Sequence, residues 1–204
     1  MTHVKICGVT SGEDAAMCVE AGADAIGLNF APSSPRCLSI ERAQAIMRVI
    51  PAHVLSVGVF VDADLETLTR YQEQVGIRCL QLHGDEPPAL VAHFLPHAYK
   101  ALRVRGPSVR DEAARYPGEF LLLDAYVPGV HGGSGARFDW SLALELAQQR
   151  KLTLAGGLTP DNVAQAVLAV KPFCVDVASG VERAPGVKDA ALVRAFVENA
   201  KAAR

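Results

Sequence analysis

Short apolar runs alternate with longer amphipathic segments along the whole chain. The runs are rich in Val, Ile and Leu and lack a continuous polar face, a pattern typical of parallel strands that are covered on both sides. They predict strands at residues 3–7, 24–29, 54–60, 78–82, 98–103, 119–124, 152–155 and 174–178.

The segments between these runs carry the start and stop signals of helices. Side chains that can cap a helix N-terminus stand at Ser11, Ser39, Asp64 and Thr159. Pro160 strengthens the last of these starts, because proline suits the first position of a helix. Residues that would end helices are Gly22, Pro51 and Gly76. Two further helices are expected at residues 108–116 and 189–201.

Strands that are each followed by a helix predict an α/β protein, a single (β/α)8 TIM barrel over residues 1–204. This length is somewhat below the roughly 250 residues usual for that fold. A doubly wound open sheet is the alternative. Its dinucleotide-binding form would place G-x-G-x-x-G after the first strand, where this chain has only Cys7-Gly8-Val9-Thr10.

Composition and charge narrow the classes of partner. Half of the residues are hydrophobic, which supplies a sizeable core and excludes global disorder. The chain has 20 Lys and Arg residues against 22 Asp and Glu residues, so nucleic acid and anionic membranes are not expected as partners. No apolar stretch approaches the roughly 20 residues that span a bilayer. Nothing in the sequence specifies an oligomeric partner.

The cysteine and histidine residues favour a reducing compartment and no bound metal. Five Cys residues without a C-x-x-C pair indicate free thiols. His53, His93 and His97 have neither the spacing nor the carboxylate neighbours of a metal site. Because the first residues also lack the apolar segment of a signal peptide, we expect a cytoplasmic protein.

Reactive side chains stand at the ends of the predicted strands, where TIM barrels carry their active sites. Strand alternation turns Lys5 and Cys7 inward on the first strand, and His83 and Asp124 follow on the fourth and sixth. Taken alone, Cys7 could be an ordinary buried thiol, His83 a residue that closes a turn, and Asp124 a carboxylate that caps the next helix. Their convergence on one rim favours a site. We also expect Lys5 to pair with Asp176 inside the barrel, because their strands become neighbours when the barrel closes.

Glycine-rich turns follow the last three predicted strands. Glycine lets the backbone approach a ligand, so that several N–H groups can point at one anion. Phosphate sites in TIM barrels recur after strands 7 and 8. We therefore expect a phosphate site built from Gly133, Ser134, Gly135, Gly156, Gly157, Ser179 and Gly180.

Several motifs, in order, carry a resemblance to one enzyme family. They are Val4-Lys5-Ile6-Cys7-Gly8, Gly22-Ala23-Asp24-Ala25-Ile26-Gly27, Ser34-Pro35-Arg36, Val57-Gly58-Val59-Phe60-Val61, Gln81-Leu82-His83-Gly84, Leu122-Leu123-Asp124, Gly132-Gly133-Ser134-Gly135, Phe138-Asp139-Trp140, Leu154-Ala155-Gly156-Gly157-Leu158 and Asp176-Val177-Ala178-Ser179-Gly180-Val181-Glu182. Over about residues 3–182 the chain resembles the phosphoribosylanthranilate isomerases of tryptophan biosynthesis.

The resemblance implies an Amadori rearrangement of N-(5-phosphoribosyl)anthranilate, a small phosphosugar. It implies Cys7 as general base, Asp124 as general acid and Arg36 as the group that holds the anthranilate carboxylate. Asp124 would protonate the ring oxygen, and Cys7 would then remove the C2 proton from the resulting iminium ion. Because the iminium ion is the electron sink, no cofactor is expected.

Two other classes of function stay open. Another phosphosugar barrel enzyme is one alternative, although an indole-glycerol-phosphate synthase would need further catalytic Lys and Glu residues. A histidine-pathway isomerase would have two aspartates, whereas the first strand here ends in Cys7. The other class is a barrel that only binds a phosphorylated ligand, and such a barrel has no need for Cys7 and Asp124.

Overall fold

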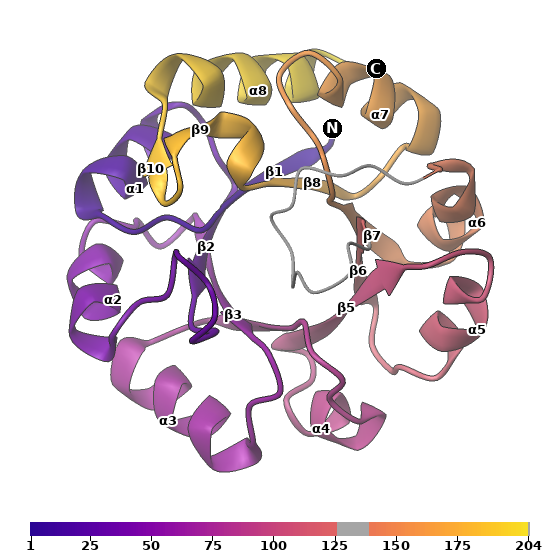
Figure 1. Cartoon of the computed structure of the whole chain (residues 1–204), viewed down its shortest axis with the longest axis horizontal. Helices are drawn as coiled ribbons and strands as arrows, with labels where there is room; N and C mark the ends of the chain where they lie inside the picture. Colours follow the sequence, from indigo (N-terminus) through magenta and orange to yellow (C-terminus); the bar gives the residue numbers. More distant parts are fainter. Residues whose placement is uncertain (126–138, 204) are drawn as a thin grey trace.

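The computed structural model describes residues 1–125 and 139–203, and these residues form a closed barrel of parallel strands surrounded by helices (Figure 1). The strands, in barrel order, are β1 (His3–Cys7), β2 (Ala25–Asn29), β3 (Leu55–Phe60), β4 (Cys79–Leu82), β5 (Ala98–Val104), β6 (Phe120–Ala125), β7 (Lys151–Leu154) and β8 (Cys174–Val177). The predicted TIM barrel is confirmed, and each predicted strand has its counterpart within one or two residues.

Helices follow the strands and cover the outside of the barrel. They are α1 (Gly12–Glu20), α2 (Ile40–Met47), α3 (Leu65–Val75), α4 (Pro88–His93), α5 (Val109–Ala114), α6 (Ser141–Gln149), α7 (Val163–Val170) and α8 (Ala190–Ala202). After β8 the chain forms a short 3-10 helix, Ser179–Val181, and a small hairpin of β9 (Glu182–Ala184) and β10 (Val187–Lys188).

Three of the predicted helix starts are confirmed by their capping bonds. The side chains of Ser11, Ser39 and Asp64 each accept a hydrogen bond from a backbone N–H in the first turn of α1, α2 and α3. The start predicted at Thr159 is wrong, because α7 begins only at Val163. The Asn162 side chain accepts the Thr159 N–H at 2.9 Å and donates to the Gly157 carbonyl at 2.9 Å, which holds the segment before α7 in a turn.

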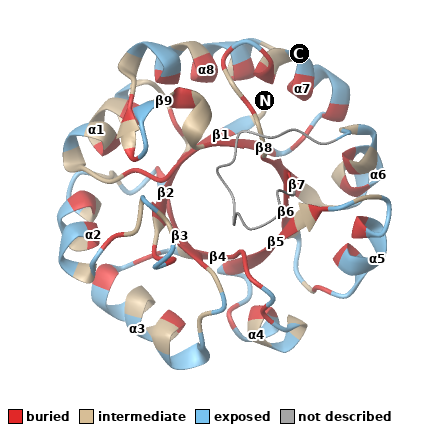
Figure 2. Ribbon diagram, viewed as in Figure 1, coloured by how far each residue is buried: buried red, intermediate tan, exposed pale blue. Residues whose placement is uncertain are grey.

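The main apolar core lies between the strands and the helices. Figure 2 shows the ring of strands almost entirely buried and the helices exposed along their outer sides. A second, smaller apolar cluster fills part of the barrel interior and consists of Ala25, Val57, Tyr99, Ala101, Leu122 and Ala155. Within residues 1–125 and 139–203, no helix combines the length and apolar character needed to span a membrane.

Candidate active site

One cavity opens where the strands end and the loops toward the helices begin. Its wall includes Cys7 from β1, His83 after β4 and Asp124 from β6, together with Arg36 from the loop after β2. The turns after β7 and β8 add backbone to the same wall through Gly156, Gly157, Ser179 and Gly180. The structure therefore brings together the predicted site residues that it describes. Gly133, Ser134 and Gly135 lie outside the described residues.

Cys7 is buried at the end of β1 beside two ammonium groups. Burial raises the pKa of the thiol, while the positive charges of Lys5 and Lys188 oppose that shift. The Lys188 ammonium donates a hydrogen bond to the carbonyl of Cys7 itself at 2.6 Å. A Cβ atom at Gly27 would stand 2.8 Å from the Cys7 sulfur, so glycine on the neighbouring strand leaves the room that the thiol occupies.

The expected ion pair inside the barrel is confirmed. Lys5 Nζ lies 2.9 Å from Asp176 Oδ2, and both side chains are buried. Burial alone would lower the pKa of Lys5, but the Asp176 carboxylate holds it well above its ordinary value. Lys5 is therefore a permanent positive charge near Cys7.

Asp124 and His83 face each other in the cavity wall. His83 Nε2 lies 3.4 Å from Asp124 Oδ2, and Asp124 Oδ1 accepts the N–H of Ala125 at 2.9 Å. Both side chains are about 94% buried, with 6% of each exposed. The predicted acid thus has one oxygen fixed by the backbone and the other directed toward an imidazole.

Arg36 is oriented by a carboxylate that sequence reasoning did not single out. Its Nε and Nη2 donate to the two oxygens of Glu182, at 2.8 and 2.6 Å, in a bidentate pair. Lys188 also donates to Glu182, at 2.8 Å. Burial alone would raise the pKa of Glu182, but these two cations hold it below its ordinary value. Glu182 ends the last family motif in the sequence, whereas no sequence signal points to Lys188.

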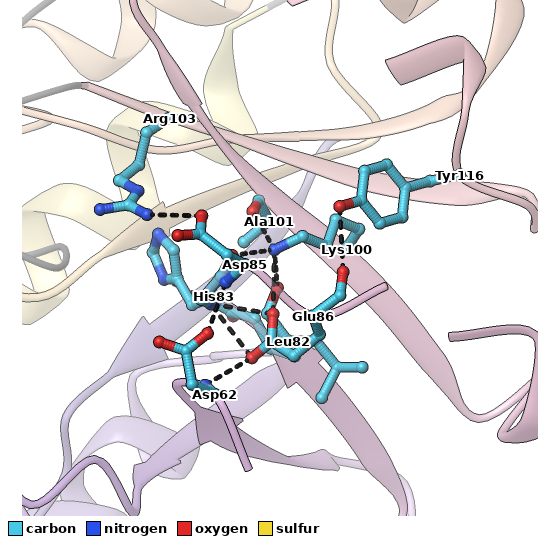
Figure 3. A network of polar contacts seen from close by, with 11 residues as sticks. Asp62, Leu82, His83, Asp85, Glu86, Lys100, Ala101, Arg103 and Tyr116 are labelled. Atoms are coloured by element: carbon cyan, nitrogen blue, oxygen red, sulfur yellow. Dashed lines mark hydrogen bonds and ion pairs between the residues drawn. The ribbon is translucent and has the colours of Figure 1, made fainter. Parts of the chain in front are cut away.

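The loop that carries His83 is held by a further buried ion pair, between Lys100 and Glu86. Glu86 accepts the backbone N–H groups of Asp62 and Gly84, each at 2.9 Å. Lys100 on β5 lies 3.0 Å from Glu86, and Figure 3 shows the pair beside His83. Because Asp62 belongs to the loop after β3, the pair ties two adjacent loops together.

The glycine turns after β7 and β8 are places where only glycine fits. Gly156 has a φ of +88°, and a Cβ there would stand 2.5 Å from the Ala125 nitrogen and 3.0 Å from Asp124 Oδ1. A Cβ at Gly180 would collide with the carbonyl oxygen of Leu158. These turns therefore bring the backbone close to the candidate acid and to each other. Among the residues that the structure describes, no group of three or more His, Cys, Asp or Glu side chains could hold a metal ion.

The family model for N-(5'-phosphoribosyl)anthranilate isomerase matches residues 4–199. The chain belongs to this family. Its sequence is 50% identical over 201 residues to the N-(5'-phosphoribosyl)anthranilate isomerase of Geobacter sp. (strain M21), with 98% of each chain covered. Over 205 residues it is also 50% identical to the enzyme of Pseudomonas aeruginosa (strain LESB58), covering 99% of this chain and 96% of that one. The chain is accordingly an isomerase of tryptophan biosynthesis.

Solved structures of the family agree with the fold over the whole chain. The phosphoribosylanthranilate isomerase of Thermotoga maritima has a TM-score of 0.91 at 41% identity, covering 99% of this chain and 100% of its own. The enzyme of Thermus thermophilus has a TM-score of 0.89 at 42% identity, with both chains covered completely. A third family structure, with a TM-score of 0.88 at 39% identity over 99% of this chain and 100% of its own, is a complex with reduced 1-(o-carboxyphenylamino)-1-deoxyribulose 5-phosphate.

Proposed function

We propose that this chain converts N-(5-phosphoribosyl)anthranilate to 1-(2-carboxyphenylamino)-1-deoxyribulose 5-phosphate by an Amadori rearrangement. Cys7 acts as the general base and Asp124 as the general acid. One observation carries the proposal: a thiol and a carboxyl group line the same cavity, with glycine turns along its edge. The phosphosugar complex of the related structure supports a ligand of this class.

The reaction begins with proton transfer from Asp124 to the furanose ring oxygen. The C1–O bond breaks, the ring opens, and C1 becomes part of an iminium ion with the anthranilate nitrogen. The Cys7 thiolate then removes the proton from C2, and the electrons of that C–H bond form the enolamine. Addition of a proton at C1 and loss of the proton from the C2 hydroxyl then give the ketone. The iminium group accepts the electrons, so the proposed steps require no added cofactor.

The remaining cavity residues bind the two ends of the substrate. Arg36, held by Glu182, presents its remaining N–H donors toward the anthranilate carboxylate, for which a planar guanidinium is well suited. The backbone of Gly156, Gly157, Ser179 and Gly180 holds the phosphate, and we extend this role to Gly133, Ser134 and Gly135. His83 contacts the sugar beside Asp124. Binding of both ends fixes the sugar for proton transfer.

A continuous assay tests the proposal through the loss of anthranilate-type fluorescence when the purified protein meets phosphoribosylanthranilate. The wild type should turn over the substrate, and Cys7→Ala and Asp124→Asn should each lower turnover by at least about 10², the low end of general acid–base effects. Cys18→Ala is the matched control, because Cys18 is a buried thiol on α1 that does not line the cavity. Arg36→Ala should chiefly raise KM. Ligand binding without turnover by the wild type would refute the enzyme and favour a barrel that only binds phosphosugars.

A further inference from the structure

A line of buried polar side chains crosses the barrel interior along the wall of the cavity. It runs from Asp176 to Lys5, from Lys5 to Gln81 and from Gln81 to His83. Lys5 Nζ lies 2.9 Å from Asp176 Oδ2 and 3.0 Å from Gln81 Oε1. Gln81 Nε2 in turn lies 3.1 Å from His83 Nδ1. All four side chains are buried, so each hydrogen bond in the line constrains the next.

The Lys5 end of the line fixes which way the Gln81 amide points. An ammonium group has only donors, and the Asp176 carboxylate keeps Lys5 charged. The Tyr99 hydroxyl also donates to the same Gln81 atom, at 3.0 Å, and burial raises the pKa of Tyr99 well above its ordinary value, so this hydroxyl keeps its proton. Two donors therefore face one Gln81 atom, which must be the carbonyl oxygen. The NH2 group is left to face His83.

The amide orientation then fixes the proton on His83. Because Gln81 Nε2 is a donor, His83 Nδ1 must accept, and a neutral imidazole with an accepting Nδ1 has its proton on Nε2. That Nε2 is buried, lies 3.4 Å from Asp124 Oδ2 and makes no hydrogen bond of good geometry within the described part of the chain. Its N–H is thus an available hydrogen-bond donor at the cavity wall.

We infer that Gln81 is a positioning residue that holds His83 in its Nε2–H tautomer, so that an N–H and not a basic nitrogen faces Asp124. The inference rests on the proposed function, in which Asp124 is the general acid. A basic nitrogen at this place would compete with the substrate for the proton of Asp124. Because Nε2 already carries a proton and Nδ1 accepts from Gln81, His83 has no free basic nitrogen to take that proton. Its N–H can instead donate to the carboxylate once the proton has moved to the sugar.

The tautomer is measurable by NMR on protein with 15N-labelled histidine, without any turnover. A spectrum of His83→Asn identifies the His83 signals by their loss. We expect the wild type at neutral pH to show an unprotonated Nδ1 and a protonated Nε2. Gln81→Glu replaces the donor by an acceptor of the same shape and should give Nδ1 a proton. Gln148→Glu, the same chemical change on the exposed side of α6, should leave the His83 signals unchanged.

Turnover supplies a second measurement. A protonated Nδ1 makes His83 an imidazolium or frees Nε2 as a base, and either form leaves less protonated Asp124 for catalysis. Gln81→Glu should therefore lower kcat at neutral pH by at least about tenfold, equivalent to about 1.4 kcal/mol in the barrier, with a smaller change in KM. The alkaline decline of activity should begin at lower pH.

The outcomes separate this inference from the proposed function. A wild type that isomerises the substrate but shows a protonated His83 Nδ1 would overturn the inference alone. An unchanged His83 spectrum in Gln81→Glu would do the same, and the wild-type spectrum decides the question even if that variant does not fold. A wild type with the Nε2–H tautomer but no isomerase turnover would instead overturn the proposed function.

Discussion

Replacement of Lys100 by methionine should destabilise the protein more than replacement of any surface lysine. The Lys100 ammonium contacts four oxygen atoms: Glu86 Oε2 at 3.0 Å and the carbonyls of Leu82, Gly84 and Ala101 at 3.0, 2.5 and 3.1 Å. Only 3% of its side chain and 1% of that of Glu86 are exposed, so water cannot replace these bonds.

The expected size of the effect follows from the charge that is left behind. Loss of one partner from a buried ion pair costs about 3–5 kcal/mol, because the other charge stays buried without compensation. For a chain of about 200 residues, where 1 kcal/mol corresponds to about 2–4 °C, the Tm should fall by about 6–20 °C. Glu86 keeps the N–H groups of Asp62 and Gly84, which places Lys100→Met toward the lower end of this range.

Urea unfolding of single and double variants tests this reasoning. Addition of Glu86→Gln to Lys100→Met removes the uncompensated charge and should return about 1–3 kcal/mol. The matched control is Lys151→Met. Lys151 pairs with Glu119 at 2.9 Å at the surface, and its loss should cost about 1 kcal/mol or less. If Lys100→Met costs no more than Lys151→Met, or if the double variant is no more stable than Lys100→Met, the uncompensated-charge argument is wrong.

Three further predictions concern the cavity. Lys5→Met removes a charge that opposes the raised pKa of Cys7, so reaction of Cys7 with iodoacetamide should require higher pH than in the wild type; an unchanged pH profile would contradict this electrostatic role. Glu182→Gln leaves Arg36 with a weaker, neutral partner and should raise KM for phosphoribosylanthranilate by about 10-fold, as the loss of about 1.4 kcal/mol of binding would do, with folding intact by circular dichroism. Gly156→Ala forces a Cβ to within 2.5 Å of the backbone of β6 and should lower kcat and the Tm together; a stable and fully active variant would show that this turn can move.

The apolar pattern predicted the fold because each strand is brief, apolar on both faces and bounded by a loop with helix signals. Alternation on β1 also predicted that Lys5 would face Asp176. The two residues are direct partners in the pairing of β1 with β8, which closes the barrel. Local rules were weaker where a side chain two or three residues away decides the conformation. Thr159 had the residue type of an N-cap, but the hydrogen bonds of Asn162 delay the helix to Val163.

The ion pairs that join separate elements were not predicted from the sequence, for a different reason. Neither Lys100 nor Glu86 was singled out from the sequence. Lys100 alternates with Tyr99 and Ala101, which point into the barrel, and its side chain is buried on the other side of β5, where it meets Glu86 from the preceding loop. Only the three-dimensional packing of adjacent loops brings these groups together, and no spacing in the sequence encodes it. The same holds for Arg36 and Glu182, which are 146 positions apart.

The lysines near Cys7 show why a buried thiol site needs carboxylates as well. Burial alone would lower the pKa of Lys5 and so favour its neutral amine form. A neutral amine cannot oppose the raised pKa of the thiol. Asp176 keeps Lys5 charged, although its own negative charge raises the pKa of Cys7. Burial keeps the pKa of Cys7 above its ordinary value, but the charge of Lys5 lowers that pKa more than the charge of Asp176 raises it. Asp176 therefore raises the pKa of Cys7 directly, through its own charge, and lowers it indirectly, by keeping Lys5 protonated. The indirect effect is the larger one.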